Sequence, residues 1–212
     1  MRSNKGEPLY SNFFGQSSFS SLAIVNNRCL VKVSKEAPLE LFAPLGCGMQ
    51  TGAGAILNTL NMRSGASVAV FGTGSVGMAA IMAAKIRKAS IIIGVDIDEG
   101  RLEIARSLGA THCINGSDLD MVDQIRTICD EDGVNYAVDC TGIAAIIERM
   151  IDSLGTLGKA ATIGAPAPGT RISVDVLSQL TKGRQYIGCN QGESVPQQVC
   201  PQLRIYAYTI DM

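Results

Sequence analysis

Three glycines in one short loop are the residues whose types and spacing point most directly to chemistry. Gly72, Gly74 and Gly77 follow the apolar run 68–71 in the order G-x-G-x-x-G. Gly72 allows a sharp turn out of a strand, Gly74 leaves room for a phosphate group against the main chain, and Gly77 allows close helix packing. A helix that begins near Ser75 would direct its free N–H groups and positive dipole end at that phosphate.

An acid supplies the second half of this pattern. Asp96 closes the apolar run 91–95, about twenty residues past Gly77, which is the spacing of a dinucleotide-binding fingerprint. The carboxylate would accept hydrogen bonds from both hydroxyls of an adenosine ribose and would repel a 2′-phosphate. Ile97 and Asp98 supply no cation, so the pattern predicts NAD rather than NADP. The alternatives are an ordinary tight turn and a solvated acid at a strand end.

The cysteines and the histidine offer little further chemistry. Seven cysteines form no C-x-x-C pair and have an odd count, which favours reduced thiols buried among apolar neighbours over a disulfide framework. This spacing also excludes a cysteine-only zinc lobe. His112 is the one histidine of the sequence, and it is expected to be structural or exposed.

Composition limits the class of protein. With 212 residues, 46% hydrophobic residues and a net charge of −1, the chain can bury a core, and it shows no bias toward nucleic acid or membrane surfaces. The uncharged stretch 64–84 is interrupted by glycines and begins β-like, which argues against a membrane span. Residues 1–8 lack an apolar core, so no secretory signal is predicted and a cytoplasmic location is expected.

Alternating strands and helices must position the loop and the acid. The pattern predicts a six-stranded doubly wound parallel sheet of the Rossmann type, class α/β. The predicted strands are 67–71, 90–95, 111–114, 134–139, 158–163 and 184–189, and the predicted helices are 75–87, 99–107, 118–130, 143–153 and 175–181. Thr141 and Gly164 follow two of these strands at the edge where ligands bind, so both are predicted to approach a flat ring, with plain turn chemistry as the alternative.

The two flanks of this alternation are different. Two short strands are predicted at 19–25 and 28–33, with a turn at Asn26-Asn27. Between 44 and 60, small residues and four glycines recur at helical spacing, which indicates close approach to another backbone or a ligand. Residues 199–212 show no clear helical period and are expected to form a weakly anchored tail.

Several of these segments resemble one known family. The run 46–55 (GCGMQTGAGA), the GTGSVG loop and the segment Gly94-Val95-Asp96-Ile97 resemble zinc-dependent medium-chain alcohol dehydrogenases. The stretches 13–19 and 38–54 look most like the aryl-alcohol (benzyl-alcohol) branch. The resemblance spans residues 13–198, and it implies three segments: a remnant of a GroES-like catalytic domain (1–40), an NAD-binding domain (41–198) and an unmatched tail (199–212).

The resemblance also implies roles for particular residues. Cys47 matches a ligand of the catalytic zinc, Thr51 and Val76 match positions that contact the nicotinamide ring, and Arg101 flanks the adenosine ribose or phosphate. The implied cofactor-binding set is Gly72, Gly74, Val76, Gly77, Asp96, Ile97, Arg101, Thr141 and Gly164. In that family, zinc polarises the alcohol oxygen so that hydride can pass to NAD. A catalytic zinc needs three protein ligands, and only Cys47 matches one, so the other ligands are expected to precede Met1 in a longer protein.

Three functions remain open on this basis. The first is the NAD-binding half of an oxidoreductase acting on a primary, aromatic alcohol or its aldehyde. The second is a non-catalytic NAD-binding or dimerisation module, since 186–188 in the last strand could pair with a second copy. The third is an inactive fragment. None of the three involves a nucleic acid or membrane partner.

Overall fold

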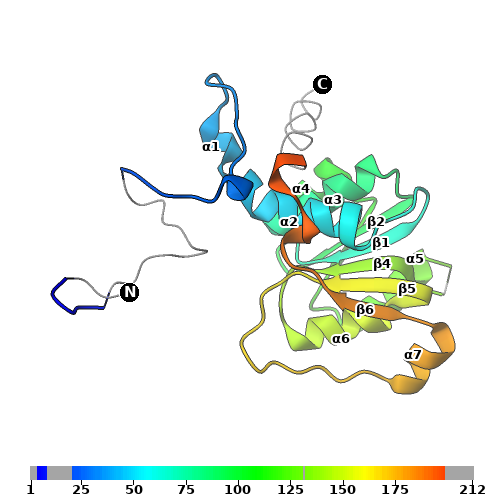
Figure 1. Cartoon of the computed structure of the whole chain (residues 1–212). Helices are drawn as coiled ribbons and strands as arrows, with labels where there is room; N and C mark the ends of the chain where they lie inside the picture. The colour runs from blue at the N-terminus through cyan, green and yellow to red at the C-terminus, as the bar shows by residue number, and fades with distance from the viewer. Residues whose placement is uncertain (1–3, 9–20, 131, 199–212) are drawn as a thin grey trace. The chain divides into compact units, whose positions relative to one another are not determined.

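The structure is a computed structural model that describes residues 4–8, 21–130 and 132–198 (Figure 1). The chain divides into two compact units, Met1–Ala37 and Pro38–Met212. In its described residues, the first unit contains one helical element, the 3-10 helix η2 (Asn27–Cys29). The predicted divisions at residues 40 and 198 stay predictions.

The prediction of a second strand at 28–33 is wrong. The side chain of Asn26 accepts a hydrogen bond from the N–H of Arg28 at 3.0 Å, and the N–H of Cys29 donates to the Asn26 carbonyl at 2.9 Å. These bonds close a tight turn where an extended segment was predicted, although the turn signal at Asn26-Asn27 itself is confirmed. Residues 21–25 also form no strand, and Leu22 and Ile24 expose 89% and 95% of their surface. Without a covering partner, such a strand pair is marginal in water.

The second unit contains the predicted doubly wound sheet. Six parallel strands pair in the order β3-β2-β1-β4-β5-β6, so the chain order reverses between β1 and β4. Ala69 at the centre of β1 pairs with Ile93 on one side and Ala137 on the other. The strands are β1 (Ser67–Phe71), β2 (Ile91–Asp96), β3 (His112–Asn115), β4 (Val134–Asp139), β5 (Leu154–Thr162) and β6 (Gln185–Gly188).

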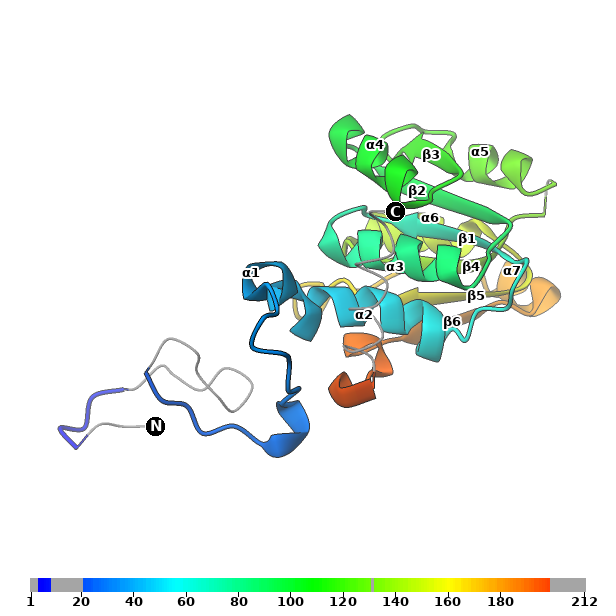
Figure 2. The same ribbon diagram turned by 90° about the horizontal axis from the view of Figure 1, so that it is seen from above.

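Helices cover both faces of this sheet (Figures 1 and 2). α3 and α4 lie on one face, while α5 and α6 lie on the other. All of them start and end within three residues of the predicted bounds, because apolar residues at helical spacing mark them in the sequence. Their bounds are α3 (Ser75–Ile86), α4 (Glu99–Leu108), α5 (Met121–Ile128), α6 (Ala144–Asp152) and α7 (Val176–Lys182).

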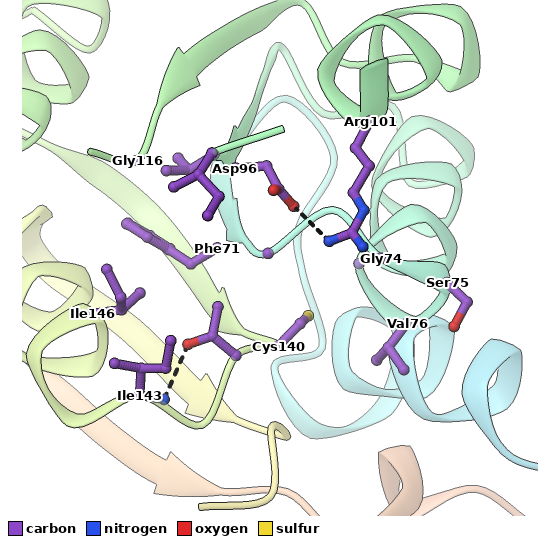
Figure 3. A pocket seen from close by; sticks show the side chains of 15 residues that line it. Phe71, Gly74, Ser75, Val76, Asp96, Arg101, Gly116, Cys140, Ile143 and Ile146 are labelled. Atoms are coloured by element: carbon purple, nitrogen blue, oxygen red, sulfur yellow. Dashed lines mark hydrogen bonds and ion pairs between the residues drawn. The ribbon is translucent and has the colours of Figure 1, made fainter. Parts of the chain in front are cut away.

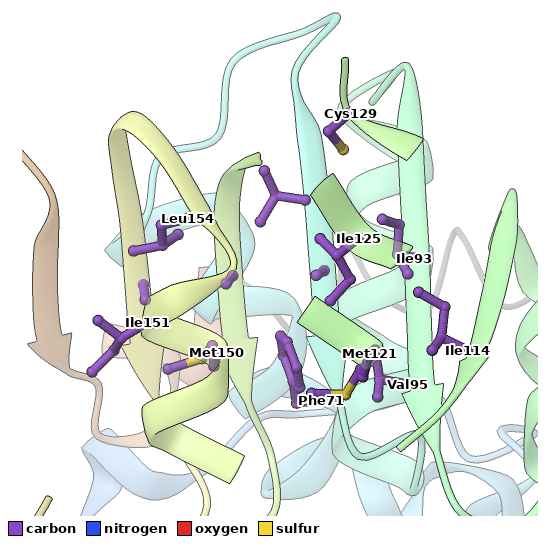
Figure 4. Close-up of a cluster of buried hydrophobic side chains, with 14 of the residues drawn as sticks. Phe71, Ile93, Val95, Ile114, Met121, Ile125, Cys129, Met150, Ile151 and Leu154 are labelled. Atoms are coloured by element: carbon purple, nitrogen blue, oxygen red, sulfur yellow. The ribbon is translucent and has the colours of Figure 1, made fainter. Parts of the chain in front are cut away.

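The core lies between the sheet and its helices. Every residue of β1 is buried, as expected for a parallel strand covered on both faces. A cluster beneath α5 and α6 joins Phe71 of β1 to Met121 and Met150 of these helices (Figure 4). Complete burial of a side chain such as Phe71 contributes about 1.5–3 kcal/mol to folding.

β5 begins four residues earlier than predicted. Val134 of β4 pairs with Leu154, but Tyr136 pairs with Lys159, so extra residues of β5 bulge between these two pairs. The sequence around this bulge contains Gly155 and Gly158, which read as a turn rather than as strand. The strand therefore starts before the bulge, at Leu154.

The glycine-rich segment 44–60 is helical, as predicted, and it packs closely on two neighbours. A Cβ on Gly52 of α2 would collide with the carbonyl oxygen of Val76 in α3, and one on Gly54 would collide with that of Gly192. These backbone approaches explain why the helix tolerates residues of low helix propensity. The segment comprises η3 (Ala43–Gly46), α2 (Gly48–Gly54) and the π-helical turn η4 (Ala55–Thr59); α1 (Leu39–Phe42) precedes it, and η5 (Gln191–Glu193) follows β6.

Within the described ranges, the structure contains no helix long and apolar enough to cross a membrane. The predicted tail at 199–212 lies outside the described residues.

Candidate functional site

A cleft of about 450 Å³ opens beyond the carboxyl ends of β1, β2 and β4 (Figure 3). This is where the strand order reverses, the usual ligand position in open α/β sheets. Of the predicted cofactor-binding residues, the cleft brings together Gly72, Gly74, Val76, Gly77, Asp96, Ile97, Arg101 and Thr141.

The glycines of the first loop are required for different reasons. Gly72 has a φ of +87°, and a Cβ there would lie 2.8 Å from the Cγ2 atom of Thr141. A Cβ on Gly77 would collide with the carbonyl oxygen of Gly72, so this glycine lets α3 close onto the loop. A Cβ on Gly74, by contrast, would meet nothing within 4 Å. Neither packing nor left-handed backbone requires a glycine at position 74, and the open space there fits a group bound against the main chain.

The N-terminus of α3 forms the other part of this phosphate-sized space beside Gly74. Gly74 is the N-cap residue and gives the helix no side-chain cap. The first N–H groups of a helix have no partner inside it, and with the helix dipole they favour an anion. Ser75 and Val76 of this first turn line the cleft. The loop and helix start can therefore hold a phosphate or pyrophosphate.

Asp96 lies on the opposite wall, at the end of β2, and only 6% of its side chain is exposed. Its Oδ2 atom accepts hydrogen bonds from the backbone N–H of Thr73 at 2.7 Å and from the Thr73 hydroxyl at 3.0 Å. Its Oδ1 atom accepts one from the N–H of Asp98 at 3.1 Å. The guanidinium of Arg101 is 3.9 Å from Oδ2 (Figure 3).

These contacts keep the carboxylate charged. Burial by itself raises the pKa of Asp96, but the hydrogen bonds from Thr73 and from the Asp98 and Ile97 backbone outweigh it and hold this pKa below its ordinary value. An ionised carboxylate presents about four acceptor positions, and these hydrogen bonds occupy most of them. Asp96 can thus offer a fixed negative charge to a ligand in the cleft.

Thr141 is placed by a buried acid at the end of β4. Asp139 is fully buried, and its Oδ1 atom accepts hydrogen bonds from the Thr141 N–H at 2.8 Å and from the Thr141 hydroxyl at 2.7 Å. Gly164 does not line the cleft. A Cβ there would lie 2.8 Å from the Thr141 backbone nitrogen, so Gly164 lets the loop after β5 pack against the loop after β4.

Apolar side chains form the remaining walls. Ile97 and Ile143 line the cleft and expose 75% and 55% of their surface. Ile146 lines it near Ile143 (Figure 3). Such surfaces suit the faces of a flat ring. Ile143 and Ile146 are not predicted from the sequence, although an isoleucine immediately before a helix that follows a ligand-binding edge is a usable signal.

Cys140 is a further cleft residue; the sequence places it directly after the predicted strand 134–139 and predicts a reduced thiol. Burial raises the pKa of the Cys140 thiol far above its ordinary value, and the negative charge of Asp139 adds to this effect. The thiol therefore stays protonated and is a poor nucleophile. The other described cysteines are also free; Cys129 and Cys189 are buried, whereas Cys29 and Cys47 are exposed, against the prediction of uniformly buried thiols.

Cys47 and Thr51, for which the resemblance implies catalytic roles at the zinc and at the nicotinamide ring, lie outside the cleft, beside and within the neighbouring helix α2. Cys47 precedes α2 and is exposed, while Thr51 lies within it and is 8% exposed. α2 meets the cleft through α3: the helices touch where Gly52 faces the Val76 carbonyl, and Val76 lines the cleft from the other side.

The described residues do not assemble a metal site by themselves. They contain no group of three histidine, cysteine, aspartate or glutamate side chains that could hold a metal ion. His112 is exposed at the start of β3, where its Nδ1 atom lies 2.9 Å from the Thr111 hydroxyl.

Comparison with known proteins identifies relatives of this chain. A family model described as "Zinc-binding dehydrogenase" matches residues 75–204. A curated protein, "Probable alcohol dehydrogenase" from a Pseudomonas species, is 40% identical over 196 residues, which are 90% of this chain and 61% of that protein.

Solved structures agree with the observed fold. A zinc-binding domain protein of the alcohol dehydrogenase type from Burkholderia ambifaria is 50% identical with a TM-score of 0.91, covering 98% of this chain and 56% of that one. A benzyl alcohol dehydrogenase from Acinetobacter calcoaceticus is 43% identical with a TM-score of 0.90, covering 98% and 58%. The chain thus spans between half and two thirds of the length of these relatives.

Proposed function

Because this chain belongs to the zinc-binding dehydrogenase family, we propose that it is the NAD-binding half of an oxidoreductase that transfers hydride between a primary aromatic alcohol and NAD. The observation that carries this proposal is the cleft itself. An open space at Gly74, an uncapped helix start and a buried, ionised Asp96 line one cavity. These features match the pyrophosphate and the ribose of a dinucleotide.

Each wall of the cleft takes one part of the cofactor in this proposal. The loop 72–77 and the first turn of α3 bind the pyrophosphate, Asp96 accepts from the ribose, and Arg101 flanks it. Ile97 and Ile143 contact the adenine ring. Val76 and Thr141, together with Thr51 and Gly164 in the adjoining elements, surround the nicotinamide end.

Preference for NAD over NADP is part of the proposal. A 2′-phosphate would approach the negative charge of Asp96, which is held ionised by its hydrogen bonds. Arg101 is the one cation that lines the cleft among the described residues, and it faces Asp96 at 3.9 Å. A carboxylate already paired with the nearest cation favours the unphosphorylated ribose.

Calorimetric titration of NADH into the 212-residue chain tests the cofactor assignment. Asp96→Asn should weaken NADH binding by about 1–3 kcal/mol, the usual value of a hydrogen bond to a charged group. Asp123→Asn is the matched control, because Asp123 is an exposed carboxylate of α5 outside the cleft. No heat of binding with the unaltered chain, or equal affinities for all three proteins, would refute the assignment.

The aromatic substrate rests on similarity to the benzyl alcohol dehydrogenase from Acinetobacter calcoaceticus. Substrate contacts in such a protein involve residues beyond the part that this chain matches, since the match covers 58% of that structure. Comparison of kcat/KM for benzyl alcohol and for a straight-chain primary alcohol, measured with added zinc, tests the preference. A higher value for the straight-chain alcohol would contradict it.

Zinc chemistry does not follow from the described residues, because they offer no three-ligand group. Cys47 remains the candidate for one ligand. This same observation favours a second candidate function, NAD binding without turnover. NADH binding combined with no oxidation of benzyl alcohol at saturating zinc would support this second function and exclude the first for the 212-residue chain.

The proposal extends to assembly and location. β6 pairs with β5 alone among the described strands, and its four residues are exposed, which fits pairing with the same strand of a second copy. The free thiols of the described cysteines fit a reducing cytoplasm.

A further inference from the structure

Thr73 is a polar residue between Gly72 and Gly74 that is completely buried. Its methyl group lies over Gly94, where a Cβ would be 3.3 Å from the Thr73 Cγ2 atom. Its hydroxyl and its backbone N–H both donate to Oδ2 of Asp96, at 3.0 Å and 2.7 Å. The methyl and the hydroxyl of one side chain therefore both contact β2, two residues apart on the same face of that strand.

This arrangement fixes how Asp96 meets the cleft. With Oδ2 engaged twice by Thr73 and Oδ1 engaged once by the Asp98 N–H, both oxygens of the carboxylate are tied and its rotation is restricted. The loop 72–77 and the end of β2 are thereby joined through the backbone N–H and the buried hydroxyl of Thr73.

We propose that Thr73 is a positioning residue that sets the preference of the cleft for NADH over NADPH by holding the Asp96 carboxylate in place. This inference rests on the proposed function, because it concerns selectivity for the same cofactor. It assigns no contact between Thr73 and the dinucleotide. Thr73 acts through Asp96.

The charges around Asp96 explain why its position affects selectivity. Arg101 exposes 56% of its side chain and pairs with the Oδ2 atom that Thr73 also contacts. If the carboxylate could rotate away from the ribose, the negative charge would recede and the guanidinium would be released toward a 2′-phosphate. Both changes favour NADPH, and a tied carboxylate opposes both.

The test compares Thr73→Val with Thr73→Ser in the 212-residue chain. Valine keeps the shape of threonine but removes the hydroxyl, whereas serine keeps the hydroxyl and removes the methyl. Fluorescence titration gives Kd for NADH and NADPH, and the ratio of the two constants is the readout. We expect Thr73→Val to reduce the preference for NADH about tenfold, and Thr73→Ser to stay within about twofold of the unaltered chain.

A second arm separates positioning from a purely structural effect. In an Asp96→Asn background, Thr73→Val should leave the NADPH to NADH ratio unchanged, because the carboxylate that Thr73 holds is gone. A structural defect would weaken both cofactors equally and would persist in this background. If Thr73→Val does not fold, Thr73→Ala replaces it in both arms.

The possible outcomes separate the inference about Thr73 from the proposed function on which it rests. Tight NADH binding with an unchanged ratio in Thr73→Val overturns the inference and leaves the proposed function intact. A reduced preference in Thr73→Ser equal to that in Thr73→Val also overturns it, since the hydroxyl would then be irrelevant. Failure of the unaltered chain to bind either dinucleotide overturns the proposed function and the selectivity role with it.

Discussion

Gly74 and Gly77 stand in the same loop, but the structure requires them for opposite reasons. A side chain at Gly77 collides with the carbonyl of Gly72, whereas one at Gly74 enters open space at the cleft. The φ of Gly74 is −70°, a value that any residue can adopt. Folding therefore explains Gly77, whereas packing gives no reason for a glycine at position 74, which fits the proposed phosphate site.

This difference gives a prediction at the residue scale. Gly74→Val should lower the free energy of unfolding by only about 1 kcal/mol, the cost of an unfavourable N-cap residue, yet weaken NADH binding at least tenfold, which corresponds to about 1.4 kcal/mol. Gly77→Ala should instead destabilise the fold by roughly 3 kcal/mol, because the helix must move off the loop. Urea denaturation and calorimetric titration of both variants measure these effects. Normal NADH affinity in Gly74→Val would show that the space is not a ligand site.

Asp96 gives a second residue-scale prediction, a dependence of stability on pH. Its pKa is lowered in the folded chain, so the folded state favours the ionised form more than the unfolded state does. The resulting stabilisation is complete above the unfolded pKa of about 3.9 and is lost as the pH falls through the lower folded pKa. The unaltered chain should thus exceed Asp96→Asn in unfolding free energy by about 1–3 kcal/mol at neutral pH.

Urea denaturation of both proteins from neutral pH down into the acid range checks this prediction. The difference between them should hold steady until the pH approaches the unfolded pKa and then shrink. Asp123→Asn, at an exposed carboxylate outside the cleft, should show little difference at any pH. A difference that grows on acidification would mean that the sign of the Asp96 shift is wrong.

At the scale of elements, η5 packs on α2 and holds it against the rest of the second unit. Gly192 lies at the centre of this turn with a φ of +68°, and its flanking residues Gln191 and Glu193 are also left-handed. The Nδ2 atom of Asn58 donates to the Gly192 carbonyl at 3.0 Å, and the Ser194 hydroxyl donates to the Gln50 carbonyl at 3.2 Å. Because α2 supports Val76 through Gly52, this turn contributes to the shape of the cleft from a distance.

Gly192→Ala tests that contribution. A Cβ there would lie 2.6 Å from the Gln50 carbonyl oxygen and 2.7 Å from the Gly54 Cα atom, in addition to its unfavourable backbone conformation. Gly169→Ala is the matched control, since Gly169 has a φ of +85° and open space around it. The control should lose about 1–2 kcal/mol of unfolding free energy, and Gly192→Ala should lose roughly 1–3 kcal/mol more. If both variants lose the same unfolding free energy in thermal or urea denaturation, η5 is not closely packed against α2.

The helices and strands also show how much of the fold could be predicted from the sequence. The six strands and the crossover helices were predictable because buried parallel strands are continuous apolar runs and the helices follow the 3.6-residue period. The strand predicted at 28–33 failed because β propensity carries little weight without a partner strand. Asp96 and the glycines could be placed in one cleft from their spacing. The place of Ile146 in the cleft could not, since it depends on how α6 meets the end of β4 in space. The contact of Thr73 with Asp96 could not either, since it depends on how the loop after β1 meets the end of β2.

At the scale of the whole molecule, the cleft and the exposed edge of the sheet are separate surfaces. The cleft lies at the carboxyl ends of β1, β2 and β4, whereas β6 is the edge strand beyond β5 (Figure 1). An open edge strand presents unpaired N–H and C=O groups, which favours pairing with another chain. Tyr186 and Ile187 of β6 expose 39% and 38% of their surface, and Leu180 of the preceding helix α7 exposes 76%.

Self-association through β6 is therefore the prediction for the assembled molecule. The chain should sediment at twice its mass of 22.3 kDa, and Ile187→Lys should shift it to the monomer, because a lysine on an edge strand disfavours strand pairing. Leu119→Lys is the matched control: it places the same charge on a leucine that is 99% exposed before α5, and it should leave the dimer intact.

NADH affinity should stay unchanged in Ile187→Lys, since neither β6 nor Leu119 lines the cleft. Sedimentation equilibrium decides the matter, and a monomer in the unaltered chain, or a dimer that survives Ile187→Lys, would exclude β6 as the interface.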